Sequence, residues 1–143
     1  MDIQDKIKSI KHSFMAFRNG IVADTLRKAG MPYNIIFGLQ LPQISEIARE
    51  CEKDLLLAET LWQDSGVRES RLLACYLFPA AEISEKMAAQ LASAVRTHEE
   101  ADILSFRLLR HLPYAPTLAD TLSSDENTLA SYCGKALRRN LDA

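Results

Sequence analysis

The chain has 143 residues, of which 48% are apolar and 25% are charged, and its formal net charge is −2. This composition suits one folded domain with its own core, which we place at residues 1–143, and it excludes a disordered polyelectrolyte. Residues 1–28 carry six basic and three acidic side chains, whereas residues 29–102 carry six basic and twelve acidic ones. A uniformly cationic surface for nucleic acid is therefore excluded, although a single basic face is not.

The residue types that bind metals or cofactors show no useful spacing. The cysteines are odd in number and lack the pattern of a zinc site, which indicates reduced thiols in apolar surroundings: Cys51, Cys75 and Cys133. The histidines lie far apart in the sequence, and no glycine-rich nucleotide loop or nucleophile elbow occurs. We therefore expect no metal and no cofactor. No apolar signal core or membrane-length apolar run is found, so we expect a cytoplasmic protein that does not enter membranes.

Short helices joined by tight turns are predicted along the N-terminal part. Residues 2–17 form the first, because an apolar side chain recurs every three or four residues. A second helix covers residues 21–28 and stops at Gly30, a favourable C-terminal glycine. Residues 31–41 are the least regular stretch, since a proline and a glycine limit any helix there. Pro42 then suits the first turn of a third helix.

The helical pattern becomes clearer after Asp54, which can cap a helix that runs to Asp64. The next predicted helix, residues 67–78, is apolar through its second half, so we expect it to be buried on most sides. The best-buried side chains are expected on the inward stripes of this helix and the two that follow: Leu72, Leu73, Leu77, Phe78, Leu91, Ile103 and Phe106.

Three start signals mark the helices of the C-terminal part. Ser84 begins one of them. Residues 97–100, Thr-His-Glu-Glu, have the pattern of a capping box and predict a helix that reaches His111. Residues 123–126, Ser-Ser-Asp-Glu, offer a second capping box for the last helix, which extends to Leu141.

The succession of elements indicates an all-α fold. No segment alternates polar and apolar residues with a period of two, so no sheet is expected. About six to eight short helices with short turns favour antiparallel pairs stacked as a solenoid of HEAT-like repeats. The sequence shows no clean internal repeat, and from the pattern alone a plain helical bundle stays open.

Five short segments of the chain have the character of family motifs: Phe-Gly-Leu-Gln-Leu-Pro-Gln-Ile at 37–44, Leu-Trp-Gln-Asp-Ser at 61–65, Arg-Glu-Ser-Arg-Leu-Leu-Ala at 68–74, Glu-Ala-Asp-Ile-Leu-Ser at 100–105, and Ser-Ser-Asp-Glu-Asn at 123–127. Their order and spacing over roughly residues 23–140 resemble the DNA alkylation repair family of AlkD-like, HEAT-like repeat glycosylases. The resemblance implies a right-handed superhelix whose concave, basic face binds duplex DNA. It also implies the removal of alkylated purines, where a carboxylate near the sugar stabilises the cationic transition state.

The chain departs from this family at its active-site stretch, a tryptophan and an aspartate followed three residues later by the catalytic aspartate. Ala101 stands at the tryptophan position, Asp102 matches the first aspartate, and Ser105 stands at the catalytic one. A serine hydroxyl cannot supply the negative charge that a developing cation needs. The single tryptophan, Trp62, matches a structural position, and we expect it in the core. The chain is also shorter than the family's glycosylases, so we expect a shallower cradle.

Two groups of side chains are the site candidates. Asp102 is the catalytic candidate if the chain is active, although an acid in the first turn of a helix also simply stabilises the helix dipole. The candidate phosphate contacts lie late on two helices: Arg107, Arg110, Lys135, Arg138 and Arg139. Ordinary solvated charge at helix C-termini would give the same pattern.

We interpret the chain as a non-catalytic binding or scaffold module related to these glycosylases. Its partner would be duplex DNA, bound through a shallow groove, or another protein. The alternative is an active DNA glycosylase that uses Asp102 to remove cationic N3- or N7-alkylated purines from duplex DNA. The sequence leaves the oligomeric state open.

Overall fold

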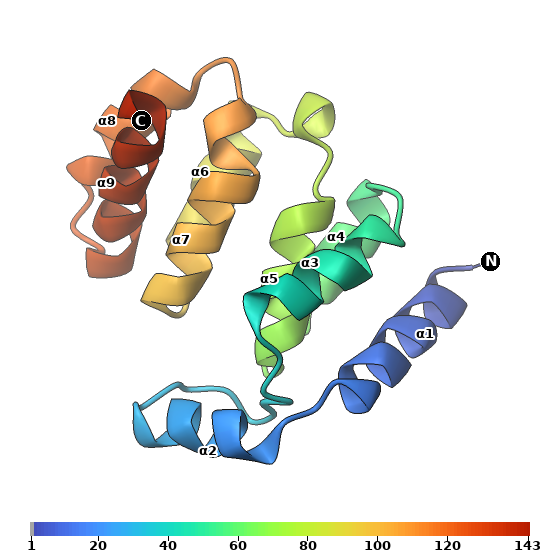
Figure 1. Ribbon diagram of the computed structural model, residues 1–143. Coiled ribbons are helices and arrows are strands. Elements are labelled where there is room, and N and C mark those ends of the chain that lie inside the picture. The colour runs from blue at the N-terminus through green and yellow to red at the C-terminus, as the bar shows by residue number, and fades with distance from the viewer. Residues whose placement is uncertain (1) are drawn as a thin grey trace. The chain divides into compact units, whose positions relative to one another are not determined.

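The computed structural model describes residues 2–143, and this part of the chain is helical without any sheet (Figure 1). It contains nine α-helices and two short 3-10 turns, and its strand-like pairing is limited to one isolated bridge between Ile35 and Val67. The predicted all-α class is confirmed, and the succession of short helices is consistent with a helical-repeat fold. Within residues 2–143, no helix is both long and apolar enough to cross a membrane. The helices form two compact units that meet in sequence at Phe78 and Pro79.

The first unit contains five helices: α1 (Ile3–Ala16), α2 (Gly20–Lys28), α3 (Leu41–Arg49), α4 (Leu55–Gln63) and α5 (Arg68–Leu77). Polar side chains begin three of them, because Asp2, Asn19 and Asp54 accept hydrogen bonds from backbone N–H groups in the first turns of α1, α2 and α4. Pro42 lies in the first turn of α3, as predicted.

The central helix of this unit is α5, whose ten residues are all buried. Its apolar side chains include Leu72, Leu73 and Leu77, and together with Phe78 they are at most 1% exposed, which confirms their predicted burial. Trp62 of α4 is also buried, and its ring forms a T-shaped pair with the Phe78 ring, with the centroids 6.3 Å apart. The predicted core position of the single tryptophan is therefore confirmed.

Buried polar groups of α5 hold the irregular segment between α2 and α3. The Glu69 carboxylate accepts hydrogen bonds from the backbone N–H groups of Phe37 at 3.0 Å, Gly38 at 3.0 Å and Leu39 at 3.3 Å. The Arg68 guanidinium donates to Glu69 and to the carbonyl oxygen of Leu39, both at 2.8 Å. Two segments that resemble the repair family, residues 37–44 and 68–74, are thus bonded to each other.

Two further polar side chains of α5, Ser70 and Arg71, bind residues at the C-terminal end of α4. The Arg71 guanidinium lies 3.5 Å from the centroid of the Trp62 ring and donates to the Trp62 carbonyl oxygen at 2.8 Å. Ser70 donates to Asp64, whose carboxylate also pairs with Lys11 of α1 at 3.0 Å. Since these polar side chains are matched by acceptors and ring faces, α5 can be buried along its whole length without isolated charges.

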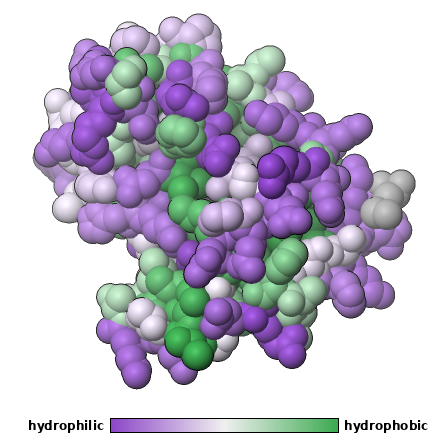
Figure 2. All heavy atoms as spheres, in the orientation of Figure 1, coloured by the Kyte–Doolittle hydropathy of each residue, from purple (hydrophilic) through white to green (hydrophobic). Residues whose placement is uncertain are grey.

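A small apolar cluster of its own lies under α2. The cluster consists of Ala23 of α2 and of Tyr33 and Ile36 from the segment that follows. The half-buried Leu26 and Met31 pack against it. The helix is otherwise solvent-facing, with Ile21 81% exposed. Figure 2 shows apolar atoms at the surface around α2, whereas hydrophilic side chains cover α1 on the same face.

The second unit contains η1 (Ala80–Glu82), α6 (Glu85–Ser93), α7 (His98–Arg107), η2 (Leu109–His111), α8 (Ala115–Ser123) and α9 (Thr128–Asp142). Ser84 and Thr97 cap α6 and α7 as predicted, and the Glu100 carboxylate completes the start of α7 by accepting from the Arg96 backbone N–H at 2.9 Å. Helices α7 and α9 lie side by side and run in the same direction, while α8 runs the opposite way against α9 (Figure 1).

The inward faces of α6 and α7 differ from the prediction. Leu91 and Ile103 are half-buried, and Phe106 is 41% exposed, so their expected place in the core is wrong. The residues of α7 that are buried lie next to Ile103 and Phe106, on a neighbouring side of the helix: Glu100, Ala101, Leu104 and Ser105. Small side chains occupy this face because α7 packs closely on α9, where the Cys133 thiol approaches the Ala101 carbonyl oxygen.

The start of the last helix also differs from the prediction. Helix α9 is capped by Asn127, whose side chain accepts from the N–H groups of Leu129 and Ala130, so the capping box expected at residues 123–126 is wrong. Ser123 instead ends α8 (Ala115–Ser123), a helix that was not predicted. Pro116 lies in the first turn of α8, where a proline is well tolerated.

The corrected packing of α7 can be tested with a pair of matched substitutions. We expect Phe78→Leu to lower the free energy of unfolding by about 1–2 kcal/mol, because this ring is 1% exposed. Phe106→Leu removes the same atoms from a ring that is 41% exposed, and we expect a change within about 0.5 kcal/mol. Urea unfolding followed by circular dichroism measures both. Equal losses of unfolding free energy in the two variants would contradict the exposed position of Phe106.

Candidate nucleic-acid interface

The exposed side of α7 and α9 carries a cluster of interacting polar and aromatic side chains. The Tyr132 hydroxyl donates to Asp102 Oδ1 at 2.9 Å, and Arg139 Nη2 lies 4.0 Å from the same oxygen. The His98 ring meets the Tyr132 ring edge-on, with the centroids 4.4 Å apart. Tyr132 and Arg139 are seven residues apart on α9 and therefore project from the same side of the helix.

The electrostatics of this cluster keep Tyr132 protonated. Its hydrogen bond to the Asp102 carboxylate raises the pKa of Tyr132, and partial burial and the negative charge of Asp102 act in the same direction, while Arg139 opposes them. The hydroxyl therefore stays a hydrogen-bond donor to Asp102. About half of the Asp102 side chain, 49%, remains exposed, so solvent screens its attraction to Arg139.

Ser105, at the position where the resemblance places the catalytic aspartate, faces away from this surface. It is fully buried, and its hydroxyl donates to the Cys133 carbonyl oxygen of α9 at 3.2 Å. Burial between the two helices removes water from the neighbouring Cys133 thiol and raises its pKa to about 11. The hydroxyl of Ser105 thus joins α7 to α9 and does not face solvent.

Three of the five predicted basic residues lie on the same side as Asp102. Phe106 follows Asp102 by one helical turn, and the Arg110 guanidinium covers its ring at 4.0 Å. Lys135 is exposed on α9 between Tyr132 and Arg139. We call this surface the α7–α9 face and define it by its six side chains: Asp102, Phe106, Arg110, Tyr132, Lys135 and Arg139.

The other two predicted basic residues, Arg107 and Arg138, are not members of this face. Arg138 donates to the Pro116 carbonyl oxygen at 3.1 Å and pairs with Asp120, both on α8. Arg107 follows Asp102 by five residues, which turns its Cα–Cβ bond by about 140° around the axis of α7, but its guanidinium still lies 5.3 Å from the centroid of the Phe106 ring. Arg138 is therefore separated from the other predicted basic residues, whereas Arg107 borders the side chains around Asp102 through Phe106.

Phe106 was expected in the core, and His98 had no predicted role at this face. A signal for both was present in the sequence, because His98, Asp102, Phe106 and Arg110 recur at intervals of four residues. That spacing places side chains along one row of a helix. Among residues 2–143, no group of three or more metal-binding side chains is placed to hold a metal ion.

The fold and this face together define an all-helical protein that presents three cations and one carboxylate on the parallel helices α7 and α9 and on the η2 turn that follows α7. The family model described as DNA alkylation repair enzyme matches residues 10–130, and the chain belongs to this family. Neither the curated proteins nor the solved structures give a match to the chain.

Proposed function

We propose that this protein binds duplex DNA through the α7–α9 face and does not remove alkylated bases. Arg110, Lys135 and Arg139 supply positive charge that suits the phosphate backbone, and binding would release the counterions condensed on the DNA. Family membership supports an interaction with DNA. Phe106 and Tyr132 add ring surface between the cations, which suits contact with sugars.

The observation that carries the non-catalytic proposal is the buried, neutral Ser105. Removal of an alkylated purine builds positive charge on the sugar, and a nearby carboxylate stabilises that charge by Coulomb attraction. Ser105 offers no such charge and faces α9. Asp102 does carry a charge, but it is held by the Tyr132 hydroxyl and lies beside Arg139, and both reduce its attraction for a second cation.

A second candidate function is an active glycosylase that uses Asp102. The half-exposed carboxylate on a cationic face favours this alternative, because bound DNA would lie near it. The hydrogen bond from Tyr132 would then orient the carboxylate towards the sugar. The two candidates differ in one measurable quantity, the rate of base release.

We expect duplex DNA that carries N7-methylguanine or N3-methyladenine to lose these bases at the spontaneous rate in the presence of the protein. Each 1.36 kcal/mol of transition-state stabilisation is a tenfold change in rate, so even weak catalysis by a carboxylate would be visible. The assay separates released bases by chromatography at protein concentrations that saturate the DNA.

The control for this assay is a pair of charge-neutralising variants. Asp102→Asn removes the carboxylate of the α7–α9 face, and Glu126→Gln removes an exposed carboxylate in the loop before α9. Base release that is robust in the wild type and in Glu126→Gln, but lost in Asp102→Asn while DNA binding persists, would make the glycosylase the correct function.

A further inference from the structure

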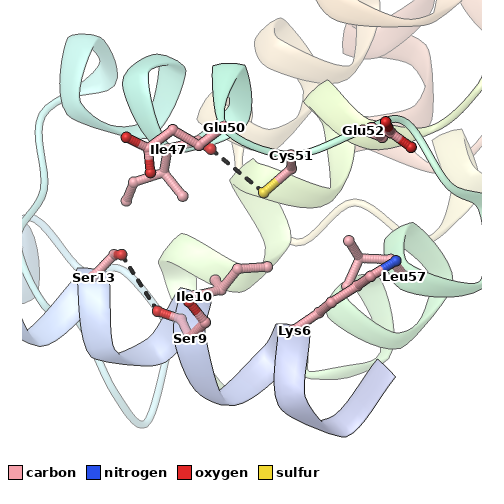
Figure 3. Close-up of a pocket in the computed structure, with 9 residues that line it drawn as sticks. All are labelled: Lys6, Ser9, Ile10, Ser13, Ile47, Glu50, Cys51, Glu52 and Leu57. Carbon is pink, nitrogen blue, oxygen red and sulfur yellow. Dashed lines mark hydrogen bonds between the residues drawn. The ribbon is translucent and has the colours of Figure 1, made fainter. Parts of the chain in front are cut away.

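A cavity of about 300 Å³ lies between α1 and α3 in the first unit, on helices that contribute nothing to the α7–α9 face. Figure 3 shows the side chains that line it. The inner part is apolar and is formed by Ile10, Ile47 and Leu57, each at most 5% exposed. This volume is at the lower end of the range of about 300–1,000 Å³ found for small-molecule sites.

The rim of the cavity is polar, with its charges at two ends. Figure 3 shows Lys6 and Glu52 at one end, where the ammonium and the carboxylate oppose each other. The other end carries the Glu50 carboxylate and the Ser13 hydroxyl. One ammonium and two carboxylates give the rim a net charge of about −1, and Glu50 supplies the unbalanced charge.

The Cys51 thiol lies between these ends and points into the cavity (Figure 3). It donates to the Ile47 carbonyl oxygen at 3.4 Å. Burial raises the pKa of Cys51, the charge of Glu50 raises it further, and Lys6 lowers it. The thiol is therefore protonated at neutral pH, and its slow reaction with a thiol reagent at higher pH can be used to measure whether the cavity is occupied.

We propose that this cavity binds a small cationic amphiphile, a molecule with a short aliphatic body and a primary ammonium group. The aliphatic body would cover Ile10, Ile47 and Leu57, which removes apolar surface from water. The ammonium would lie between the Glu50 carboxylate and the Ser13 hydroxyl. Ser13 already donates its proton to the Ser9 carbonyl oxygen, so its hydroxyl oxygen is left to act as an acceptor. An anion of the same shape would meet the charge of Glu50.

The proposal does not rest on DNA binding, and protection of Cys51 tests it directly. The folded protein is treated with methyl methanethiosulfonate at pH 8.5, and the modification rate of Cys51 is followed by mass spectrometry. Cys75 and Cys133 are buried, so Cys51→Ser gives the background rate. At ten times its dissociation constant, n-hexylamine should slow the reaction of Cys51 about tenfold, because the free fraction falls in that proportion. Hexanoate, the matched anion, should give no protection at the same concentration.

Two variants connect the protection to the charge at the rim. Glu50→Gln should weaken the apparent affinity for n-hexylamine at least threefold, whereas Glu46→Gln removes an exposed carboxylate from α3 outside the cavity and should leave the affinity unchanged. Circular dichroism recorded with and without amine verifies that the protein stays folded. Absence of protection by the amine, equal protection by hexanoate, or equal effects of the two variants would each overturn the proposal.

Discussion

Glu69→Ala should lower the free energy of unfolding by about 3–5 kcal/mol, because it removes one partner of a buried ion pair. The Arg68 guanidinium would keep its charge beside α5 without the carboxylate. The backbone N–H groups of Phe37, Gly38 and Leu39 would lose their acceptor in a buried place. Urea unfolding followed by circular dichroism measures the loss, and the irregular segment before α3 should become susceptible to proteolysis first.

The matched substitutions separate charge from packing at this position. Glu69→Gln keeps the shape and one acceptor oxygen, so we expect a loss between those of the wild type and Glu69→Ala. Glu46→Ala removes an exposed carboxylate from α3, and we expect a change within about 0.5 kcal/mol. If Glu69→Ala were as mild as Glu46→Ala, Glu69 would not hold the segment.

The second large effect concerns DNA. We expect the triple variant Arg110→Ala, Lys135→Ala, Arg139→Ala to bind duplex DNA at least on the order of 100-fold more weakly than the wild type near 0.1 M salt. The reason is that each phosphate contact releases condensed counterions. The slope of log K against log salt concentration should fall by roughly 2.7 when three contacts are lost, at about 0.9 for each. Fluorescence anisotropy with a labelled duplex at several salt concentrations measures both quantities.

The control for the DNA measurement uses two exposed or partly exposed basic residues that are not part of the face. Lys86→Ala with Arg138→Ala removes two positive charges of the same unit, and we expect less than about a threefold loss of affinity and a nearly unchanged slope. Equal losses in both variants would mean that the attraction comes from overall charge. If the wild type did not bind duplex DNA at low salt, the proposed function would be wrong. The proposal that the cavity binds an amine would not be affected by this result.

The start of most helices could be predicted because it depends on a few neighbouring residues. Asp54, Ser84 and Thr97 cap the helices expected of them, since a side-chain oxygen near the first free N–H groups is a local interaction. The absence of period-two alternation was enough for the all-α class. The order of short motifs was enough for the family, which the match over residues 10–130 confirms.

The composition of the site was predictable in part. Asp102 and the basic residues were identified from motif position and spacing, but the sequence could not show which of them share a surface. Arg138 and Arg139 are neighbours in sequence, yet about 100° of helical rotation directs one to Asp120 of α8 and the other to Asp102 of α7. Only the packing of α9 between two different helices separates them.

The buried side of α7 was likewise decided by tertiary structure. By apolar character, Ile103 and Phe106 could fill a core as well as Leu104, so periodicity alone allows more than one inward face. The sequence by itself determined that α7 exists, where it begins and that it belongs to an all-helical repair-family chain. The neighbouring helix decided the rest, because close packing on α9 accommodates Ala101 and Ser105 and turns the larger Phe106 ring out to the surface.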